Sequence, residues 1–249
     1  MKSTDSQPND ALRAYAQRLN QPVLGEGTAL KNILERIRQK TPSFHSQMTP
    51  LSIDYSSAKE IFKFTAERLC ERQGKHFVID DENRWVLQNL VAYLIGDEAN
   101  CAFSLHKGIY LYGPVGVGKT LVFQAMKLFC QAVPLPTFTV VSTRQIVEEL
   151  EKAKSFQGME RYQSGVVCFD DLGEEPTSTK IYQREEIVMA AILAQRYEAY
   201  LAKGQQTHIT SNLLPSEIES HYGSRIADRC RQLFNFVPMG NKESQSRRG

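Results

Sequence analysis

The sequence predicts an α/β fold with a five-stranded parallel sheet, preceded by a helical region. After residue 105, short apolar runs alternate with helical stretches, which is the pattern of a parallel sheet covered by helices. The first hundred residues instead place apolar side chains at helical spacing. We therefore divide the chain into a helical N-terminal region, residues 1–79, and an α/β domain, residues 80–249.

Helices are predicted before the sheet at 29–39, 57–72 and about 80–96. Ser57 and Glu60 have the Ser-x-x-Glu spacing of a capping box at the start of the second helix. The third helix is expected to start at Asp80 or Asp81, and Gly96 fits its C-terminal end. This part of the chain carries no catalytic motif.

The predicted strands of the α/β domain span 108–112, 137–141, 165–169, 206–210 and 233–238. The predicted helices between them lie near 119–131, 143–154, 181–202 and 215–231. Strands that alternate with helices in this way are typical of a sheet whose strands all run in one direction.

Composition excludes several classes of protein. With 41% hydrophobic and 23% charged residues among 249, the chain resembles soluble globular domains. No apolar run approaches the roughly 18 residues that span a bilayer, and the N-terminus lacks the apolar core of a secretion signal. We therefore expect a cytoplasmic protein with no membrane partner. The five cysteines are never spaced as CxxC, which predicts reduced, mostly buried thiols.

The charge of the chain says little about whether it binds nucleic acid. The net charge of +2 is too small to favour nucleic-acid binding by the molecule as a whole. The stretch from Ser224 to Gly249, however, holds six basic residues and two acidic ones. That end of the chain is locally basic.

The segment Gly113-Pro114-Val115-Gly116-Val117-Gly118-Lys119-Thr120 fits the pattern GxxxxGK[ST] in full. It follows an apolar run and opens an amphipathic stretch that begins at Leu121, which is the order of strand, loop and helix that phosphate binding requires. Glycines let backbone amides point at phosphate oxygens, Lys119 brings a charge to the β- and γ-phosphates, and the Thr120 hydroxyl ligates Mg²⁺. The sequence therefore predicts an ATP site from Gly113 to Leu121, with Mg²⁺. We call residues 113–120 the P-loop.

An apolar run from Val166 to Phe169 ends in two acids, Asp170 and Asp171. Alone, such a pair is usually a turn or a helix cap. Beside a P-loop, Asp170 is expected to hold Mg²⁺ through its water shell, and Asp171 to orient and polarise the attacking water. The shorter Asp171 side chain, where a Glu would reach further, predicts slow turnover.

Two later segments carry further candidates. Asn212 follows the predicted strand at 206–210. Its side-chain amide either senses the γ-phosphate or forms hydrogen bonds within a turn. Arg225 and Arg229 are four residues apart and so share one helix face. That face is either solvated or supplies an arginine finger that reaches the γ-phosphate of a neighbouring subunit.

Together these motifs resemble the DnaC/IstB branch of the AAA+ ATPases. The segments GPVGVGKT, CFDDLGEEP, THITSNL and YGSRIADR occur in the same order and at similar spacing over about residues 105–240. The last segment and the tail NKESQSRR look more like DnaC-type helicase loaders than IstB-type transposition helpers. The resemblance implies a P-loop AAA+ core with strand order 5-1-4-3-2 and no separate C-terminal lid.

The resemblance also implies a function. The protein is expected to hydrolyse ATP, to assemble as an ATP-dependent homo-oligomer, and to load a replicative helicase onto single-stranded DNA. Its N-terminal region, residues 1–79, is expected to bind that helicase as its partner. The catalytic residues carried over by position are Lys119, Asp171, Asn212, Arg229 as the finger in trans and Arg225 as a second basic contact. An IstB-like transposition helper and a nucleotide-gated scaffold, in which hydrolysis is incidental, remain as alternatives.

The segment between the second and third predicted strands occupies the region that touches single-stranded DNA in related initiators. Its charged and aromatic side chains suit that contact and are Lys152, Lys154, Phe156, Arg161 and Tyr162. The other interpretation is an ordinary amphipathic helix with solvated lysines.

Overall fold

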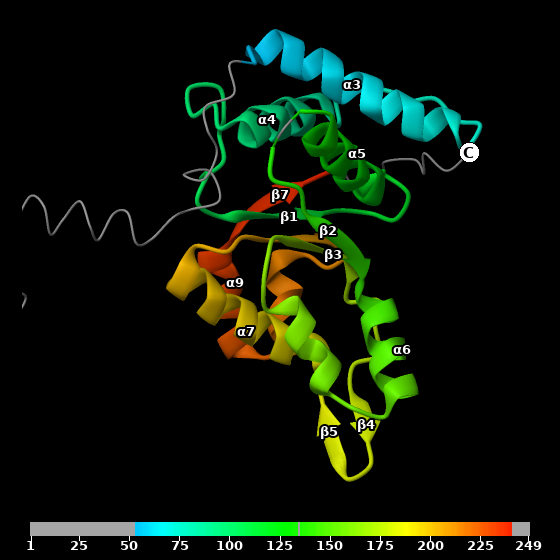
Figure 1. Cartoon of the computed structure of the whole chain (residues 1–249), viewed down its shortest axis with the longest axis vertical. Helices are drawn as coiled ribbons and strands as arrows, with labels where there is room; N and C mark the ends of the chain where they lie inside the picture. Colours follow the sequence, from blue (N-terminus) through cyan, green and yellow to red (C-terminus); the bar gives the residue numbers. More distant parts are fainter. Residues whose placement is uncertain (1–52, 134, 241–249) are drawn as a thin grey trace, which may run out of the picture. The chain divides into compact units, whose positions relative to one another are not determined.

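The computed structural model describes residues 53–133 and 135–240 (Figure 1). The chain divides between Pro42 and Ser43 into two units, and all described residues belong to the second. The helix predicted at 29–39 and the tail NKESQSRR lie outside the described residues.

A five-stranded parallel sheet forms the centre of the described unit. Its strands are β1 (Gly108–Tyr112), β2 (Thr139–Ser142), β3 (Val167–Leu172), β6 (Thr207–Ser211) and β7 (Phe234–Pro238). The order across the sheet is β2-β3-β6-β1-β7. Counted along the chain and read from the β7 edge, this is the order 5-1-4-3-2, which confirms the predicted fold.

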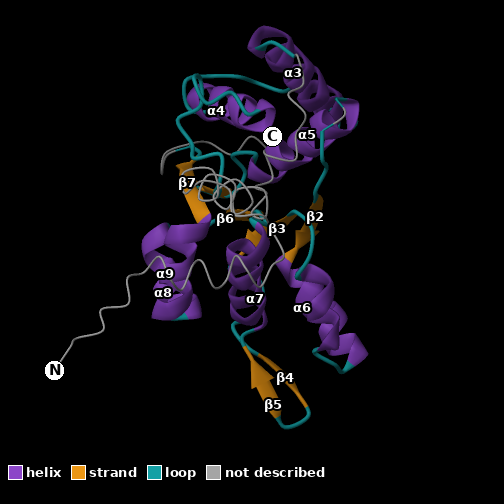
Figure 2. Cartoon of the chain, turned by 60° about the vertical axis from the view of Figure 1, so that its left-hand side comes forward, coloured by secondary structure: helices purple, strands orange, loops and turns teal. Residues whose placement is uncertain are grey.

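Helices cover both faces of the sheet (Figures 1 and 2). One face packs against α3 (Tyr55–Glu71), α4 (Arg84–Ile95) and α5 (Lys119–Ala132), and the other against α6 (Thr143–Ala153), α7 (Val188–Lys203), α8 (Ile218–Tyr222) and α9 (Ser224–Leu233). Alternation along β1 sends Ile109 and Leu111 to the first core and Tyr110 to the second. All three side chains are fully buried, which explains why the strand reads as a continuous apolar run.

The predicted strand positions agree with the structure to within two residues at the start of each strand, but two helix predictions need correction. Residues 179–186 form a two-stranded antiparallel hairpin, β4 (Thr179–Ile181) and β5 (Arg184–Glu186), so the helix predicted at 181–202 begins only at Val188. The helix predicted at 215–231 is broken at Gly223, whose φ of 87° suits glycine and separates α8 from α9. A 3-10 turn, Pro215–Glu217, precedes α8.

The start of α3 also differs from the prediction. Asp54, and not Ser57, caps the helix, because its carboxylate accepts hydrogen bonds from the amides of Ser56 and Ser57 at 2.9 and 3.0 Å. The predicted capping box is therefore wrong. Helix α4 ends as predicted, at a left-handed Gly96.

Helix α3 lies on the N-terminal side of the boundary predicted between residues 79 and 80, yet it packs on α4 and α5. Its buried Ala58, Phe62 and Ala66 belong to the same apolar core as Phe123 and Met126 of α5. A buried phenylalanine or methionine of this kind contributes roughly 1.5–3 kcal/mol to folding. The described unit therefore depends on residues well before residue 80.

The five cysteines are free, and all but the partly exposed Cys101 are buried, in agreement with the predicted reduced thiols. Burial raises the pKa of the Cys130 and Cys230 thiols to about 12. Within residues 53–133 and 135–240, no helix is long and apolar enough to span a bilayer.

Candidate functional site

The P-loop connects β1 to α5 in a tight path against the last strand. Gly113 comes so close to the chain after β7 that a Cβ there would lie 2.0 Å from the carbonyl oxygen of Met239. Gly118 caps α5 at a φ of 101°, a conformation that other residues rarely adopt. These two positions explain why glycine is needed in the loop.

Lys119 is buried at the first turn of α5, with 5% of its surface exposed. Its ammonium donates to the carbonyl oxygens of Gly113 and Pro114 at 2.7 and 2.9 Å, and to Oδ1 of Asn212 at 2.7 Å. The ammonium also lies in the wall of the cavity described below, where it can bring positive charge to a phosphate. The sequence had no way to pair Lys119 with Asn212, since 93 residues separate them.

Asp170 lies at the end of β3 beside the P-loop. Its Oδ1 accepts hydrogen bonds from Thr120 at 3.0 Å and from Thr210 of β6 at 2.6 Å. The hydroxyl of Thr120 and the carboxylate of Asp170, predicted together as metal ligands, are thus brought together from α5 and β3. Thr210 was not identified from the sequence, because it reads there as an ordinary strand residue.

Asp171 sits in a β-bulge between Phe169 and Leu172, with a left-handed φ of 57°. Its amide donates to the Thr210 hydroxyl at 2.9 Å and its carbonyl accepts from the Thr143 hydroxyl at 2.9 Å. Aspartate tolerates this backbone conformation better than most residues. The two backbone contacts therefore fix a locally strained residue at the edge of the cavity described below.

Asn212 follows β6 directly. Its Oδ1 accepts from Lys119, and its Nδ2 donates to Oε1 of Glu174 at 2.7 Å. Glu174 comes from the loop after β3, which the sequence did not single out. From the sequence, Asn212 could be either a γ-phosphate sensor or part of a turn. In the structure its side chain is hydrogen-bonded to the P-loop lysine, Lys119.

These residues surround a cavity of about 820 Å³. One wall is the P-loop with the first turns of α5, and a second is formed by the strand ends at Ser142, Asp171 and Asn212, together with Glu174. The third wall is the segment between α3 and α4, from which Phe77 and Val78 line the space. A volume of this size suits a nucleotide or another ligand of drug-like size.

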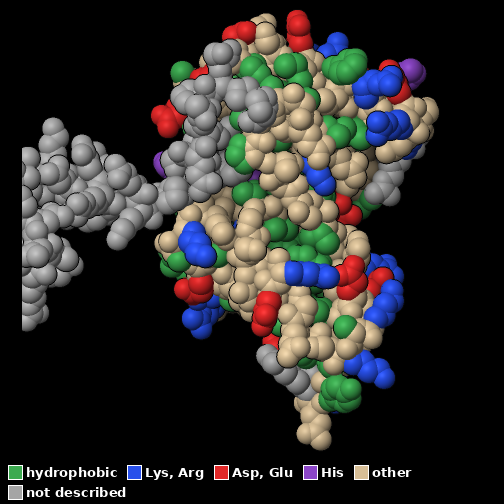
Figure 3. Space-filling model, viewed as in Figure 1, with side chains coloured by type: hydrophobic (Ala, Val, Ile, Leu, Met, Phe, Trp, Pro, Cys, Tyr) green, Lys and Arg blue, Asp and Glu red, His purple; other side chains and the backbone are tan. Residues whose placement is uncertain are grey.

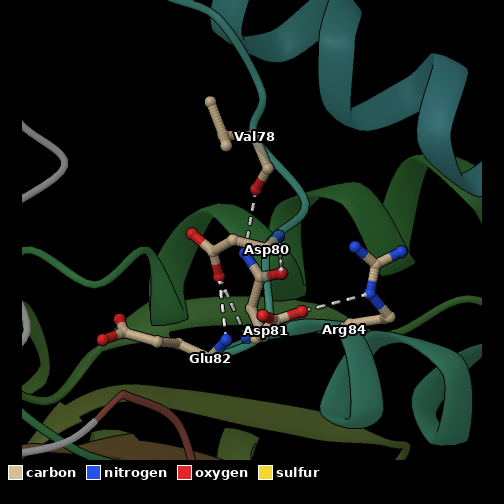
Figure 4. A network of polar contacts seen from close by, with 6 residues as sticks. Val78, Asp80, Asp81, Glu82 and Arg84 are labelled. Carbon is tan, nitrogen blue, oxygen red and sulfur yellow. Dashed lines mark hydrogen bonds and ion pairs between the residues drawn. The ribbon is translucent and has the colours of Figure 1, made fainter.

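The third wall is held by a compact polar turn (Figure 4). The Asp80 carboxylate accepts from the amides of Glu82 and Asn83 at 3.0 and 3.3 Å. Asn83, almost completely buried, returns a hydrogen bond from Nδ2 to the carbonyl of Val78 at 2.9 Å. These bonds delay the start of α4 to Arg84, later than predicted, and fix the backbone that faces the P-loop.

The side chains fit a magnesium nucleotide better than a metal held by protein alone. Mg²⁺ takes oxygen ligands and usually binds through one or two side chains plus phosphates. Thr120 and Asp170 offer such oxygens at one place. Among the described residues, no group of three or more His, Cys, Asp or Glu side chains is arranged to hold a metal ion.

Solved structures resemble the fold of this chain at low sequence identity. No protein-family model matches the sequence, and no curated protein matches it. A provisionally assigned primosome component from Streptococcus pyogenes serotype M3 is 19% identical, covers 67% of this chain and 86% of its own, and superposes with a TM-score of 0.50. The structure of DnaI is 19% identical over 66% of this chain and 87% of its own, with a TM-score of 0.51. The DnaC helicase loader is 15% identical over 66% and 93%, with a TM-score of 0.48.

The two structures with the higher scores share the parallel sheet and its helices with this chain. The chain shares the fold of these two structures. At this level of identity the likeness defines the fold alone, so the roles of individual residues must be argued from their geometry.

The two candidate arginines, Arg225 and Arg229, lie away from the cavity walls. Arg229 on α9 donates to Glu198 of α7 at 3.0 Å and places its guanidinium 4.8 Å from the ring centre of Tyr197. Only 12% of the Arg229 side chain is exposed, whereas Arg225, one turn earlier, is exposed. Neither residue lines the cavity of its own chain.

In the segment expected to touch single-stranded DNA, only some of the candidate side chains are exposed. Lys152 and Lys154 are exposed and Phe156 is partly exposed, at the end of α6 and the start of the 3-10 turn Gln157–Tyr162. Tyr162, by contrast, is buried with its ring against Phe169, so it offers no stacking surface. Arg161 is engaged by Glu149.

Several residues at the site were missed by sequence reasoning because long-range packing assembles them. Glu174 and Thr210 contact predicted residues only in three dimensions. The third wall lies before residue 80, in the region that the sequence assigned to a partner. Only the Asp-x-x-Asn spacing of Asp80 and Asn83 indicates a local turn there.

Proposed function

We propose that this chain is an ATP-hydrolysing DNA replication protein that loads a replicative helicase onto single-stranded DNA. The observation that carries the ATPase part is the buried Lys119 ammonium, held by carbonyl and amide oxygens beside Thr120 and Asp170. The loader part is supported by the order of the motifs from GPVGVGKT to YGSRIADR. The named neighbours, a primosome component and DnaI, agree with that direction.

In this proposal the P-loop amides and Lys119 bind the β- and γ-phosphates. Thr120 and Asp170 hold Mg²⁺, which supplies positive charge that neutralises the phosphate oxygens. Asp171, fixed at the bulge, orients the attacking water, and Asn212 contacts the γ-phosphate. Phe77 and Val78 of the third wall supply apolar surface for the base.

Replacement of the lysine tests nucleotide binding. Lys119→Ala is expected to weaken binding of a fluorescent ATP analogue with magnesium by roughly a factor of 10³, because a buried charge-assisted contact to phosphate is lost. Lys127→Ala, on the same helix but away from the cavity walls, is the matched control and should bind as the wild type does. Equal binding by all three proteins would remove the ATP proposal entirely.

Replacement of Asp171 separates the motor from the scaffold. Asp171→Asn keeps the shape of the side chain and should retain ATP binding while it lowers turnover by about 10²-fold or more. The measurement is phosphate release with and without single-stranded DNA. If the wild type, Lys119→Ala and Asp171→Asn all release phosphate at one background rate, a nucleotide-gated scaffold is the better description.

We place the DNA contact on the surface around Lys152, Lys154 and Phe156. Next to them, a hollow of about 690 Å³ runs to the β4–β5 hairpin, where Tyr182 is 77% exposed. Two aromatic rings and two lysines fit an unstacked strand. Figure 3 shows acidic side chains mixed with basic ones in this lower part of the molecule, so we expect modest affinity that falls with salt.

The helicase contact is proposed for the N-terminal region. A chain that starts at Ser43 keeps the whole described unit, including the core contacts of α3. We expect it to retain ATP turnover and to lose co-purification with the replicative helicase of the same cell, which the full chain should show. Helicase binding that is unchanged in the shortened chain would contradict this placement. A cytoplasmic location belongs to the same proposal.

A further inference from the structure

The amide of Asn212 has one orientation that satisfies both of its neighbours. Lys119 carries only donors, so the atom that faces it must be Oδ1, and the carboxylate of Glu174 is an acceptor, so the atom that faces it must be Nδ2. The distances of 2.7 Å on both sides agree with this assignment. Asn212 is therefore a link between the P-loop lysine and a carboxylate at the rim of the cavity.

In the proposed ATP complex, the γ-phosphate would contact the same two side chains, Lys119 and Asn212. Its oxygens only accept hydrogen bonds, so contact with Asn212 must use Nδ2, the atom that already donates to Glu174. The second hydrogen of Nδ2 does not remove the conflict, because the phosphate and the Glu174 carboxylate would then be adjacent anions on one nitrogen. Like charges a few ångströms apart repel strongly in a partly enclosed site.

From this geometry we propose that Glu174 is a positioning residue that holds Asn212 until the γ-phosphate of ATP displaces it. The proposal rests on the ATP site described above. Glu174 thereby lowers the affinity for ATP while it leaves ADP, which has no γ-phosphate, unaffected. After hydrolysis the carboxylate recaptures Asn212 and returns the site to its starting arrangement.

The loop around Glu174 suits such a movement. Glu174 is exposed, so its carboxylate is readily hydrated once it leaves Asn212. The next residue stays fixed, because Glu175 accepts from the Gly173 amide at 2.8 Å and from the buried hydroxyl of Tyr222 on α8. Burial and the neighbouring Glu175 carboxylate raise the pKa of Tyr222, which keeps that hydroxyl a donor. The side chain of Glu174 can therefore swing while its backbone remains anchored.

The test measures the affinities of full-length chains for a slowly hydrolysed ATP analogue and for ADP, both with magnesium. Glu174→Ala should tighten ATP binding about fivefold and change ADP binding less than twofold, in line with removal of one screened charge near the phosphate. Glu174→Gln, which keeps an acceptor but loses the charge, should fall between Glu174→Ala and the wild type. In an Asn212→Ala background the gain from Glu174→Ala should disappear, because the link is already broken.

Three results would overturn the inference. These are equal shifts for ATP and ADP, weaker ATP binding in Glu174→Ala, and a gain that persists without Asn212, which would indicate direct repulsion only. Glu219→Ala removes an exposed carboxylate of α8 away from the cavity walls and should change neither affinity. If Glu174→Ala loses its circular dichroism spectrum, Glu174→Gln alone decides the question. Failure of the wild type to bind either nucleotide would instead contradict the ATP site itself.

Discussion

The carboxyl edge of the sheet and the face formed by α7 and α9 hold their charged residues in different ways. At the sheet edge, Lys119 and Asp170 are bound by groups from other elements of the same chain, at 2.6 to 3.0 Å. On the α7–α9 face, Arg229 has a carboxylate partner, Glu198, that is itself 65% exposed, and Arg225 is exposed. The first arrangement joins several elements of one chain, whereas in the second Arg225 is open to an anion from outside and Arg229 would have to leave the exposed Glu198 carboxylate to meet one.

This difference leads us to expect that nucleotide binding needs one subunit and that fast hydrolysis needs two. Arg229→Ala should leave ATP affinity unchanged and lower the turnover stimulated by self-association by roughly 10³-fold, the usual value of an arginine finger. Arg225→Ala should lower it by a smaller factor. The measurement is phosphate release per subunit as the protein concentration rises.

The matched control is Arg231→Ala on the same helix, where an exposed arginine lies 3.8 Å from Asp228. It should keep the stimulation. Thermal unfolding separates a finger from a structural ion pair, since loss of a pair that supports the fold would lower the unfolding temperature of Arg229→Ala, and loss of a finger would not. Stimulation that survives in Arg229→Ala would end its assignment, and a larger loss in Arg225→Ala would transfer the role to that residue.

Helix α7 also carries a charged residue, Arg196, that is bound entirely by groups of the same chain, as Lys119 and Asp170 are at the sheet edge. Its guanidinium is fully buried and donates to the Thr207 hydroxyl and to the carbonyls of Tyr162, Gly165 and Gln206. Burial lowers its pKa to about 10, so the residue is charged at neutral pH. Because the unfolded chain binds this proton more tightly, burial weakens stability below that pH, and the weakening shrinks as the pH rises above about 10.

Arg196→Met is therefore expected to lower the free energy of unfolding by about 3 kcal/mol, because the loss of four hydrogen bonds outweighs the relief from burying a charge. Urea unfolding followed by circular dichroism measures this loss. The control, Arg144→Met, removes an exposed partner of Glu148 and should cost less than about 0.5 kcal/mol. An equal cost in both variants would mean that the buried contacts of Arg196 add nothing to stability.

The sheet edge could be predicted from the sequence because its chemistry is local. The P-loop pattern fixes both the backbone path and the order of strand and helix. Asp170 is the first charged residue after an apolar run in the sequence. The P-loop residues needed only their neighbours in the chain to be recognised, and Asp170 needed the P-loop as well. Pairings across the sheet, such as that of Thr210 with Asp170, stayed invisible because they depend on strand order.

One helix prediction failed, and one wall of the cavity could not be found from the sequence, for a different reason. Residues 181–187 were predicted as helix because the apolar periodicity of α7 extends backward into them, yet Thr179–Glu186 pair as a hairpin. Residues 1–79 stay a predicted partner-binding region, but the sequence did not connect Phe77 with the cavity, because nothing in the composition around it links it to a motif about 40 residues later. Tertiary packing overrides local preference in both places.

The smallest expected effect tests how far the sheet edge depends on its internal bonds. Thr210→Val keeps the shape of the side chain but removes the hydroxyl that donates to Asp170 and accepts from the Asp171 amide. We expect about tenfold more Mg²⁺ to be needed for half-maximal ATP turnover, because a carboxylate that has lost its supporting hydrogen bond binds metal less well. Thr210→Ser restores the hydroxyl and should return the magnesium requirement to that of the wild type. If Thr210→Val and Thr210→Ser need the same magnesium concentration, Thr120 and Asp170 position the metal without help from β6. The hydrogen bond from Thr210 to Asp170 would then contribute nothing to metal binding.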